Sequence, residues 1–325
     1  MHAHAKLNLI LSVGPPNPPD TDHPGWHPIC SWMAPIDLAD ELDLTRADAA
    51  STYAIDWAPN APRPSPIDWP LDTDLAVRAH RALEARVGKP LPVRMHLRKR
   101  VPVGGGLGGG SSDAAAMLLA LRDLYDLDLD DTSLARIGAT LGSDVAFFCR
   151  GERDPAQAIV EGFGERIERV PGVPGRVVLV IPPWSCATPA VYRAFDGVIE
   201  EADRRRRIEW EVEAQSREAR GEHRGREPLP HRVRADLVRA RMQACGSRLD
   251  GTRLFNDLWP ASCLVEPRLA DLASSLRRVT REDVHLTGSG SCLFIATAKP
   301  EKALEQCLRV VAPVEGAAAV ICSLC

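Results

Sequence analysis

A glycine-rich segment constrains this chain more than any other part of its sequence. Residues 104–113 read GGGLGGGSSD, and an alanine-rich helical pattern over 114–125 follows directly. Glycine permits positive φ angles and lacks the Cβ atom that would keep a ligand away from the backbone, so successive N–H groups can converge on one anion. The unpaired N–H groups and the dipole at the start of a helix favour negative charge at the same place. The segment therefore predicts a phosphate-binding loop.

Two common phosphate loops do not match this segment. A Walker loop ends in Gly-Lys-Ser/Thr, but here Gly110 is followed by Ser111. The glycine spacing of a dinucleotide-binding loop is present, at Gly104, Gly106 and Gly109, but such a loop follows a strand that is apolar on both faces. Residues 93–98 instead alternate apolar and basic residues, which is typical of a strand with one buried face. A flexible Gly-Ser linker is the remaining alternative, but linkers do not usually lie between a well-patterned strand and a well-patterned helix.

Composition and charge are those of an ordinary globular protein. The chain has 325 residues, more than one domain usually contains, and a formal net charge of −4 that gives no general attraction to nucleic acid. No apolar stretch approaches the roughly 20 residues that span a bilayer, and the N-terminus does not resemble a signal peptide. We therefore expect a cytoplasmic protein without a membrane or nucleic-acid partner. The oligomeric state stays open, a homodimer included.

The cysteines predict neither a disulfide framework nor a metal site. They number nine and are scattered, so reduced thiols are expected in a chain of this length. Cys322 and Cys325 form a C-x-x-C pair, but no second pair completes a set of four zinc ligands.

The patterns of strands and helices predict two α+β domains, residues 1–172 and 173–325. Residues 5–13 alternate, which places Lys6 and Asn8 on the polar face of a strand. Further strands are expected from residue 29, at 40–45, 93–98, 165–170, 176–181, 283–286 and 292–296, and further helices at 75–87 and 132–141.

An arginine-rich segment, residues 200–241, differs in kind from the rest of the second domain. Its arginines are interleaved with glutamates, a pattern typical of an exposed helix or a partly disordered insert. An RNA-binding surface is the alternative, but the glutamates would cancel most of the attraction to phosphates. A solvated surface is favoured.

Four short motifs resemble, in order and spacing, those of the GHMP kinases, which phosphorylate small molecules without a Walker loop. They are residues 5–9 (AKLNL), the glycine-serine loop, 142–145 (GSDV) and 287–291 (TGSGS). Within that superfamily, residues 25–27 (GWH), the loop form PVGGGLGGGSSD and residues 256–258 (NDL) look most like the kinases of cytidine-diphospho-methylerythritol. The resemblance covers nearly the whole chain except residues 200–241.

The resemblance implies a two-domain GHMP kinase fold, with an N-terminal domain like that of a ribosomal protein, a ferredoxin-like C-terminal domain and ligands between them. It also implies that ATP, accompanied by Mg²⁺, phosphorylates the 2-hydroxyl of cytidine-diphospho-methylerythritol, a step toward isoprenoid precursors by the non-mevalonate route.

The resemblance assigns the phosphates of ATP to the glycine loop. The residues expected to bind the nucleotide are Pro102, Val103, Gly104, Gly105, Gly106, Leu107, Gly108, Gly109, Gly110, Ser111 and Ser112. The two serine hydroxyls are expected to contact phosphate or Mg²⁺, with Ser112 as the metal ligand. The alternative is that one of them only caps the helix.

Asp144 and Lys6 match the catalytic positions of the family. Asp144 would accept the proton of the substrate hydroxyl as general base, with a turn cap as its alternative role. Lys6, close to Asp144 by resemblance, would polarise the alcohol or the γ-phosphate. From the strand pattern alone, Lys6 would be an exposed residue. Asn8 is expected to be a supporting substrate contact.

Three further residues are expected to bind the cytidine. His27 matches the family's base-reading histidine, and Trp26 stands where the family usually has tyrosine, so that it can stack but lacks a phenolic hydroxyl. Trp184 is expected to form the opposite wall, with a place in the core as the alternative.

Two other functions stay open. The first is another GHMP kinase that acts on mevalonate, homoserine or a sugar, but this function would not explain the Gly-Trp-His motif at residues 25–27. A nucleotide-binding protein without catalysis, with residues 200–241 as its interaction surface, is disfavoured because Lys6 and Asp144 are both present.

Overall fold

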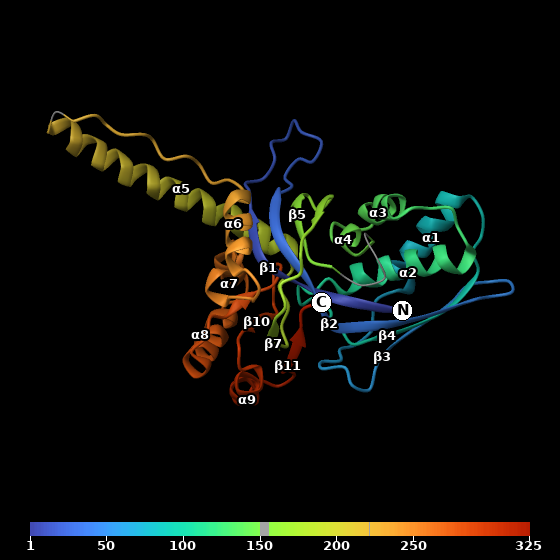
Figure 1. Ribbon diagram of the computed structural model, residues 1–325. Coiled ribbons are helices and arrows are strands. Elements are labelled where there is room, and N and C mark those ends of the chain that lie inside the picture. The colour runs from blue at the N-terminus through green and yellow to red at the C-terminus, as the bar shows by residue number, and fades with distance from the viewer. Residues whose placement is uncertain (150–155, 221) are drawn as a thin grey trace.

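The computed structural model describes residues 1–149, 156–220 and 222–325. The chain folds around two β-sheets with helices packed against them, as Figure 1 shows, and this confirms the predicted α+β class. No helix in these three ranges is both long enough and apolar enough to cross a bilayer.

Within the described residues, the first sheet has seven strands and carries most of the N-terminal half. Its main path runs β3-β4-β2-β1-β8, with β5 paired to β2 and β6 to β5. The strands are β1 (His2–Val13), β2 (Ile29–Arg46), β3 (Thr52–Trp57), β4 (Val93–Lys99), β5 (Ala158–Gly162), β6 (Arg166–Arg169) and β8 (Phe255–Asn256). The two stretches expected from residue 29 and at 40–45 form one long strand, because β2 pairs along its length with β1, β4 and β5.

The second sheet is antiparallel and has the order β11-β7-β10-β9. Its strands are β7 (Arg176–Ile181), β9 (His285–Leu286), β10 (Leu293–Ala296) and β11 (Ala318–Ser323). The prediction of a central strand at 176–181 is confirmed. The C-terminal half also contributes to the first sheet, because β8 pairs in parallel with β1. The division of the chain at residue 172 stays a prediction.

Nine helices cover the sheets in the described ranges. They are α1 (Leu75–Val87), α2 (Gly109–Tyr125), α3 (Asp131–Ala139), α4 (Val145–Cys149), α5 (Thr188–Ala219), α6 (Ala235–Cys245), α7 (Trp259–Val265), α8 (Arg268–Thr280) and α9 (Pro300–Val311). Single 3₁₀ turns lie at Leu71–Thr73 and Gly251–Arg253. Helix α2 packs on β1 and β2, and α1 packs on α2, so the glycine loop is carried between a strand and a buried helix (Figure 1).

Helix α2 begins inside the glycine segment rather than at residue 114. Its N-cap is Gly108, at a φ of +71°, and no side chain caps the helix. Ser111 and Ser112 therefore lie within the first turn, and the alternative that one of them caps the helix is wrong. The first N–H groups of α2 are left for another partner. By contrast, α1 is capped by Asp74, whose Oδ1 accepts the N–H of Ala76 at 2.9 Å.

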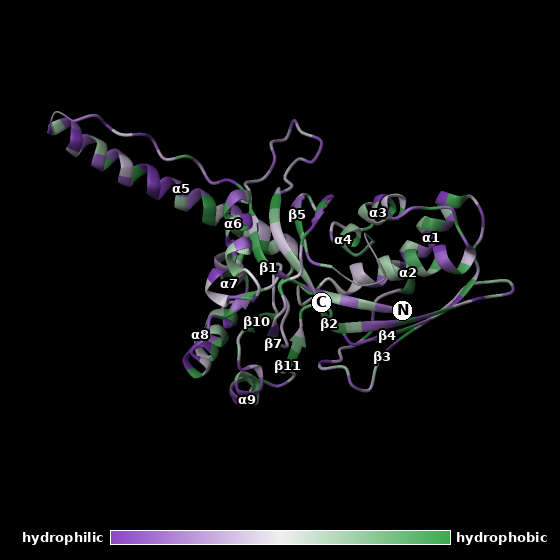
Figure 2. Cartoon of the chain, in the orientation of Figure 1, coloured by the Kyte–Doolittle hydropathy of each residue, from purple (hydrophilic) through white to green (hydrophobic). Residues whose placement is uncertain are grey.

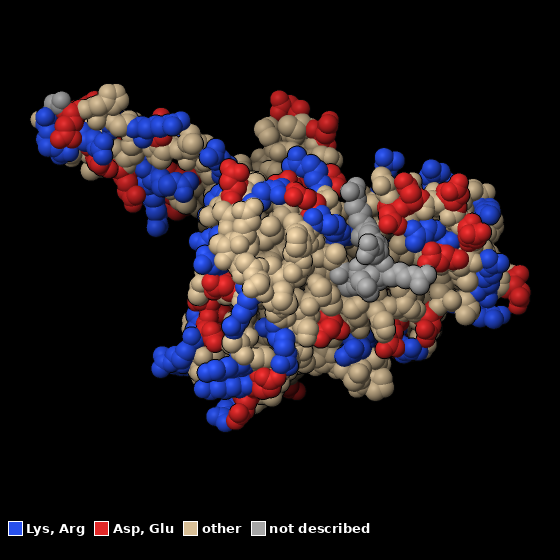
Figure 3. All heavy atoms as spheres, viewed as in Figure 1, with Lys and Arg blue, Asp and Glu red and all other residues tan. Residues whose placement is uncertain are grey.

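The arginine-rich segment is an exposed helix over much of its length. Figure 1 shows the distal part of α5 and the extended chain after it projecting away from both sheets. Its surface is hydrophilic in Figure 2, and Figure 3 shows acidic and basic atoms side by side on it. Several charges are paired along the helix, as in Arg205 with Glu201 at 2.7 Å and Arg217 with Glu213 at 2.6 Å. The predicted exposed helix is confirmed.

The strand pattern alone predicted that Lys6, on the polar face of β1, is exposed to solvent, and this prediction is wrong. Lys6 and Asn8 are each only 3% exposed. The reason lies far away in the sequence: the glycine loop and residues 287–292 cover this face. The N–H of Lys6 donates to the carbonyl of Leu107 at 2.9 Å, and the N–H of Asn8 donates to Thr287 Oγ1 at 3.1 Å.

The glycine loop is in backbone contact with the C-terminal half. The carbonyl of Gly105 accepts the N–H of Cys292 at 3.2 Å. Gly106 has a φ of +76°, and a Cβ atom added there would lie 2.4 Å from the carbonyl oxygen of Thr287. Both the conformation and the contact therefore require glycine at this position.

We expect Gly106→Ala to lower the free energy of unfolding by about 2 kcal/mol or more, because the new methyl group meets backbone rather than a flexible side chain. Gly197→Ala is the matched control, since Gly197 lies within α5 with open space around its Cα. That variant should gain about 0.5–1 kcal/mol. Urea unfolding followed by circular dichroism measures both. Equal stabilities of the two variants would contradict the close contact.

Candidate active site

A cavity of about 540 Å³ lies between the two halves of the chain. Outside the glycine loop, the structure brings five residues predicted from the sequence to its wall, namely Lys6, Asn8, Trp26, His27 and Asp144. These come from β1, from the loop that follows it and from the turn before α4. The glycine loop contributes Gly106 and Gly108, and the 287–291 loop contributes Gly288 and Ser289.

Lys6 and Asp144 form an ion pair at the centre of this wall. The Nζ of Lys6 lies 3.3 Å from Oδ2 of Asp144. The lysine side chain is 4% exposed, whereas that of Asp144 is 27% exposed, so the carboxylate is open to the cavity. A Cβ atom at Gly108 would lie 3.1 Å from Cγ of Lys6, which shows how closely the glycine loop approaches the lysine. An ammonium, a carboxylate and the glycine loop thus meet at one point.

Asn8 holds Lys6 in place. Its Oδ1 accepts from Nζ of Lys6 at 2.5 Å, and its Nδ2 donates to Oγ of Ser31 at 2.8 Å. Because both ends of the amide are engaged, its orientation is fixed by the network. Asn8 lines the cavity and also determines where the ammonium points.

Aromatic side chains form the far end of the cavity. The imidazole of His27 is buried, and its Nδ1 lies 2.9 Å from the carbonyl oxygen of Gly14. A carbonyl only accepts, so Nδ1 carries the proton of this hydrogen bond. The ring of Tyr192 lies 4.9 Å from that of His27. Trp26 is 54% exposed, and Phe163 contacts it edge-on with 5.8 Å between the ring centres.

The structure does not bring Trp184 into this cavity. Its indole packs instead under the guanidinium of Arg268, 4.4 Å from the ring centre, where α8 begins. Tyr192, on α5, is an aromatic residue of the lining that the sequence analysis missed. The sequence contains a pattern that could have predicted this residue. Thr188-Pro189 marks the start of a helix, and residues 188 and 192, four positions apart, lie on the same helix face. Both residues line the cavity.

The phenol of Tyr192 stays protonated at neutral pH. Burial raises its pKa above the usual value, and the nearby carboxylate of Asp144 raises the pKa further. A neutral ring next to the aromatic end suits the stacking of a heterocyclic base.

Residues 256–258, noted only as a family motif, have a structural role. Nδ2 of Asn256 donates to the carbonyl oxygens of Leu286 and Gly288, at 3.0 and 2.8 Å. Oδ2 of Asp257 accepts the N–H of Val13 at 3.0 Å. The motif therefore fixes the 287–291 loop and the end of β1 against each other.

The glycine loop has the conformation that an anion site needs. Gly104, Gly106 and Gly108 have φ angles of +74°, +76° and +71°. Val103, Gly104 and Gly110 are exposed, next to the uncapped start of α2. The remaining loop residues are buried or half-buried, with Pro102, Gly105, Leu107 and Ser112 buried and Gly109 and Ser111 half-buried. Their contacts with a nucleotide stay a prediction.

Comparisons with known proteins identify the family. Residues 74–152 match the family model "GHMP kinases N terminal domain". A 4-diphosphocytidyl-2-C-methyl-D-erythritol kinase of Kineococcus radiotolerans is 33% identical over 93% of this chain and 82% of its own length. One from Caulobacter sp. is 42% identical, over 61% of this chain and 63% of its own length.

A solved structure supports the same assignment over the full length. The crystal structure of a 4-(cytidine 5'-diphospho)-2C-methyl-D-erythritol kinase superposes with a TM-score of 0.66 at 28% identity, covering 100% of this chain and 98% of that one. The two-domain GHMP kinase fold expected from the motifs is thereby confirmed. With motifs, cavity and relatives in agreement, the chain belongs to the 4-diphosphocytidyl-2-C-methyl-D-erythritol kinase family of GHMP kinases.

Proposed function

We propose that this chain transfers the γ-phosphoryl group of ATP to the 2-hydroxyl of 4-diphosphocytidyl-2-C-methyl-D-erythritol, in non-mevalonate isoprenoid precursor biosynthesis. One observation carries the proposal. The Lys6–Asp144 pair lies in a cavity that has the glycine loop at one side and the aromatic end with His27 at another. The relatives are named for this kinase. The volume of about 540 Å³ suits a ligand of this class.

The chemistry follows from the positions of the two charged groups. The oxygen of the substrate hydroxyl attacks the γ-phosphorus, and Asp144 accepts the proton of that hydroxyl. The bond from the γ-phosphorus to the β,γ-bridging oxygen breaks, which releases ADP. Lys6, 3.3 Å from Asp144, offsets the charge that develops on the attacking and transferring oxygens. Asn8 keeps the ammonium in that position.

The glycine loop fits the phosphates of ATP. Its alternating positive φ angles turn backbone N–H groups toward one side, and the uncapped start of α2 adds N–H groups and a positive dipole end. Mg²⁺, when bound with ATP, neutralises charge on the phosphates and needs few protein ligands. The ranges described hold no group of three His, Cys, Asp or Glu arranged for a metal. Ser112 as the metal ligand stays a prediction.

The aromatic end fits the cytosine. Tyr192 and Trp26 offer aromatic rings, and His27 offers a polar ring edge. Its Nδ1 is held by the carbonyl of Gly14, and its Nε2 lies 3.4 Å from Oδ1 of Asp196. A mevalonate, homoserine or sugar kinase would have no use for these three rings. A protein without catalysis would have no use for the Lys6–Asp144 pair.

The decisive experiment measures ADP release by the purified protein with Mg-ATP and 4-diphosphocytidyl-2-C-methyl-D-erythritol, and checks the product mass. Phosphorylated product establishes substrate and reaction. Turnover only with mevalonate, homoserine or a sugar would show that the proposed substrate is wrong and that the chain is another small-molecule kinase. ATP binding without turnover of any of these alcohols would leave a nucleotide-binding protein.

We expect Asp144→Asn to lower kcat by about 10²–10⁴-fold, because the amide cannot accept the hydroxyl proton. The affinities for ATP and for the cytidine substrate, measured by calorimetry, should change less than threefold. Asp128→Asn, at an exposed position between α2 and α3, is the control and should behave as wild type. A kcat that survives in Asp144→Asn would exclude this carboxylate as the base.

Lys6 and Asp144 should act as a unit. Lys6→Met should lower kcat strongly in the wild-type background, but add much less in the Asp144→Asn background, since the two groups share one transition state. Steady-state rates of the four proteins in this cycle measure the coupling. Fully additive effects would show that the two residues act independently.

We expect Tyr192→Ala to weaken the binding of CDP by roughly 5- to 150-fold, as loss of one base-stacking ring costs about 1–3 kcal/mol. Trp184→Ala, which removes a ring outside the cavity, should change CDP affinity less than twofold. Calorimetric titration with CDP compares the two. The reverse order of effects would restore Trp184 as the wall of the base site.

A further inference from the structure

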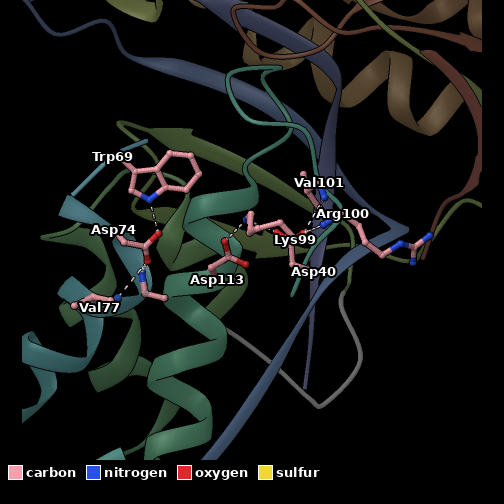
Figure 4. A network of polar contacts seen from close by, with 9 residues as sticks. Asp40, Trp69, Asp74, Val77, Lys99, Arg100, Val101 and Asp113 are labelled. Atoms are coloured by element: carbon pink, nitrogen blue, oxygen red, sulfur yellow. Dashed lines mark hydrogen bonds and ion pairs between the residues drawn. The ribbon is translucent and has the colours of Figure 1, made fainter. Parts of the chain in front are cut away.

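A buried charged network lies beneath the glycine loop, as Figure 4 shows. Lys99, the last residue of β4, donates from Nζ to Oδ2 of Asp40 on β2 and to Oδ2 of Asp113 on α2. The side chains of Lys99, Asp40 and Asp113 are 5%, 0% and 3% exposed. None of the three lines the cavity with Lys6 and Asp144.

The network joins the start of the glycine loop to its end. Oδ1 of Asp40 accepts the backbone N–H groups of Arg100 and Val101, the latter at 2.8 Å, where the chain leaves β4. Asp113 lies in α2, four residues after its start, where the loop ends. Lys99 bonds to both carboxylates. The backbone on either side of residues 102–109 is therefore tied to one buried point.

Lys99 does not act as the phosphate-binding lysine of a Walker loop. Its ammonium is sealed from solvent and engaged by two carboxylates. Burial alone would lower the pKa of Lys99, but the carboxylates of Asp113 and Asp40 outweigh burial and raise this pKa, so the charge is retained. Burial raises the pKa of Asp113 as well, against the influence of Lys99.

The loop needs such an anchor for an entropic reason. Six of the seven residues from 104 to 110 are glycine, the residue that loses most conformational freedom when it is ordered. Amides that are already fixed in place before ATP arrives bind it more tightly than amides that must be ordered on binding.

We infer that Asp40, Lys99 and Asp113 are positioning residues for ATP, which hold both ends of the glycine loop so that its N–H groups converge on the phosphates. They contact no ligand and act through the loop backbone. The inference rests on the proposed function, since it names the device that orders the loop proposed to bind ATP.

The first test compares Asp113→Ala with Asp113→Asn. The alanine variant should raise KM for ATP about tenfold, while KM for the cytidine substrate and kcat change less than twofold. The asparagine variant, whose amide oxygen can still accept from Lys99, should restore KM for ATP to within about twofold of wild type. Asp123→Asn, an exposed residue of the same helix, is the control. A role in stability alone would lower Tm without this selective change in KM.

A second variant separates positioning from folding. Lys99→Met with Asp40→Asn and Asp113→Leu removes the three charges as a unit, so that no carboxylate stays buried without its cation, and the amide oxygen at position 40 can still accept from the loop backbone. Replacing a buried ion pair or triad as a whole with uncharged residues of similar size is often neutral or stabilising, so this protein should fold. Its affinity for ATP should still fall by about tenfold. Unchanged ATP affinity in this protein and in Asp113→Ala would overturn the inference.

Hydrogen exchange without nucleotide makes the test independent of the reaction. Amides of residues 100–112 should exchange faster in Asp113→Ala than in wild type and Asp123→Asn, with the rest of α2 unchanged. Equal exchange over this segment would overturn the positioning role even if the kinase reaction is confirmed. A wild-type protein that binds no Mg-ATP would instead overturn the proposed function, while exchange would still decide the positioning role.

Discussion

The site depends on one close backbone contact, between the glycine loop and the loop at 287–292. Gly106 lies so near Thr287 that no side chain fits between them, and Cys292 donates to the carbonyl of Gly105. This contact brings the 287–292 loop, which connects β9 and β10 of the C-terminal sheet, onto the polar face of β1. It buries Lys6 and Asn8 and closes the cavity around Asp144. Without glycine at this contact, the two halves could not approach closely enough to form one site.

Two lysine–carboxylate groups lie near the glycine loop in different environments. Lys6 faces a single carboxylate that is partly open to the cavity, so its charge can act on a substrate. Lys99 faces two carboxylates that are buried, so its charge is paired within the protein. One of these carboxylates, Asp40, also binds the loop backbone. Under the roles that we propose, the same two residue types therefore serve catalysis in one place and hold the loop in the other. The difference lies in pairing as well as exposure, because two buried carboxylates largely neutralise the charge of Lys99, whereas Lys6 and Asp144 border the cavity.

Asn256 and Asp257 extend the same connection from the other side. Through them the short strand β8 fixes the 287–291 loop and the end of β1 relative to each other. The halves of the chain are thus linked by backbone pairing and by side chains. Such fixed walls suit the phosphoryl transfer that we propose, because small displacements of the reacting atoms would slow it.

The sequence alone determined the glycine loop, the strand that precedes it, the helix that follows it and the family, because these depend on local periodicity and on short motifs. Only the tertiary structure decided which groups meet. The sequence suggested Trp184 as a wall of the base site, whereas in the folded chain Trp184 packs against Arg268 and Tyr192 lines the cavity. The Asp40–Lys99–Asp113 network joins residues up to 73 positions apart on three elements, which no local pattern records. Burial of Lys6 likewise comes from segments about 100 and 280 residues away, since the environment of a strand face is set by what packs on it.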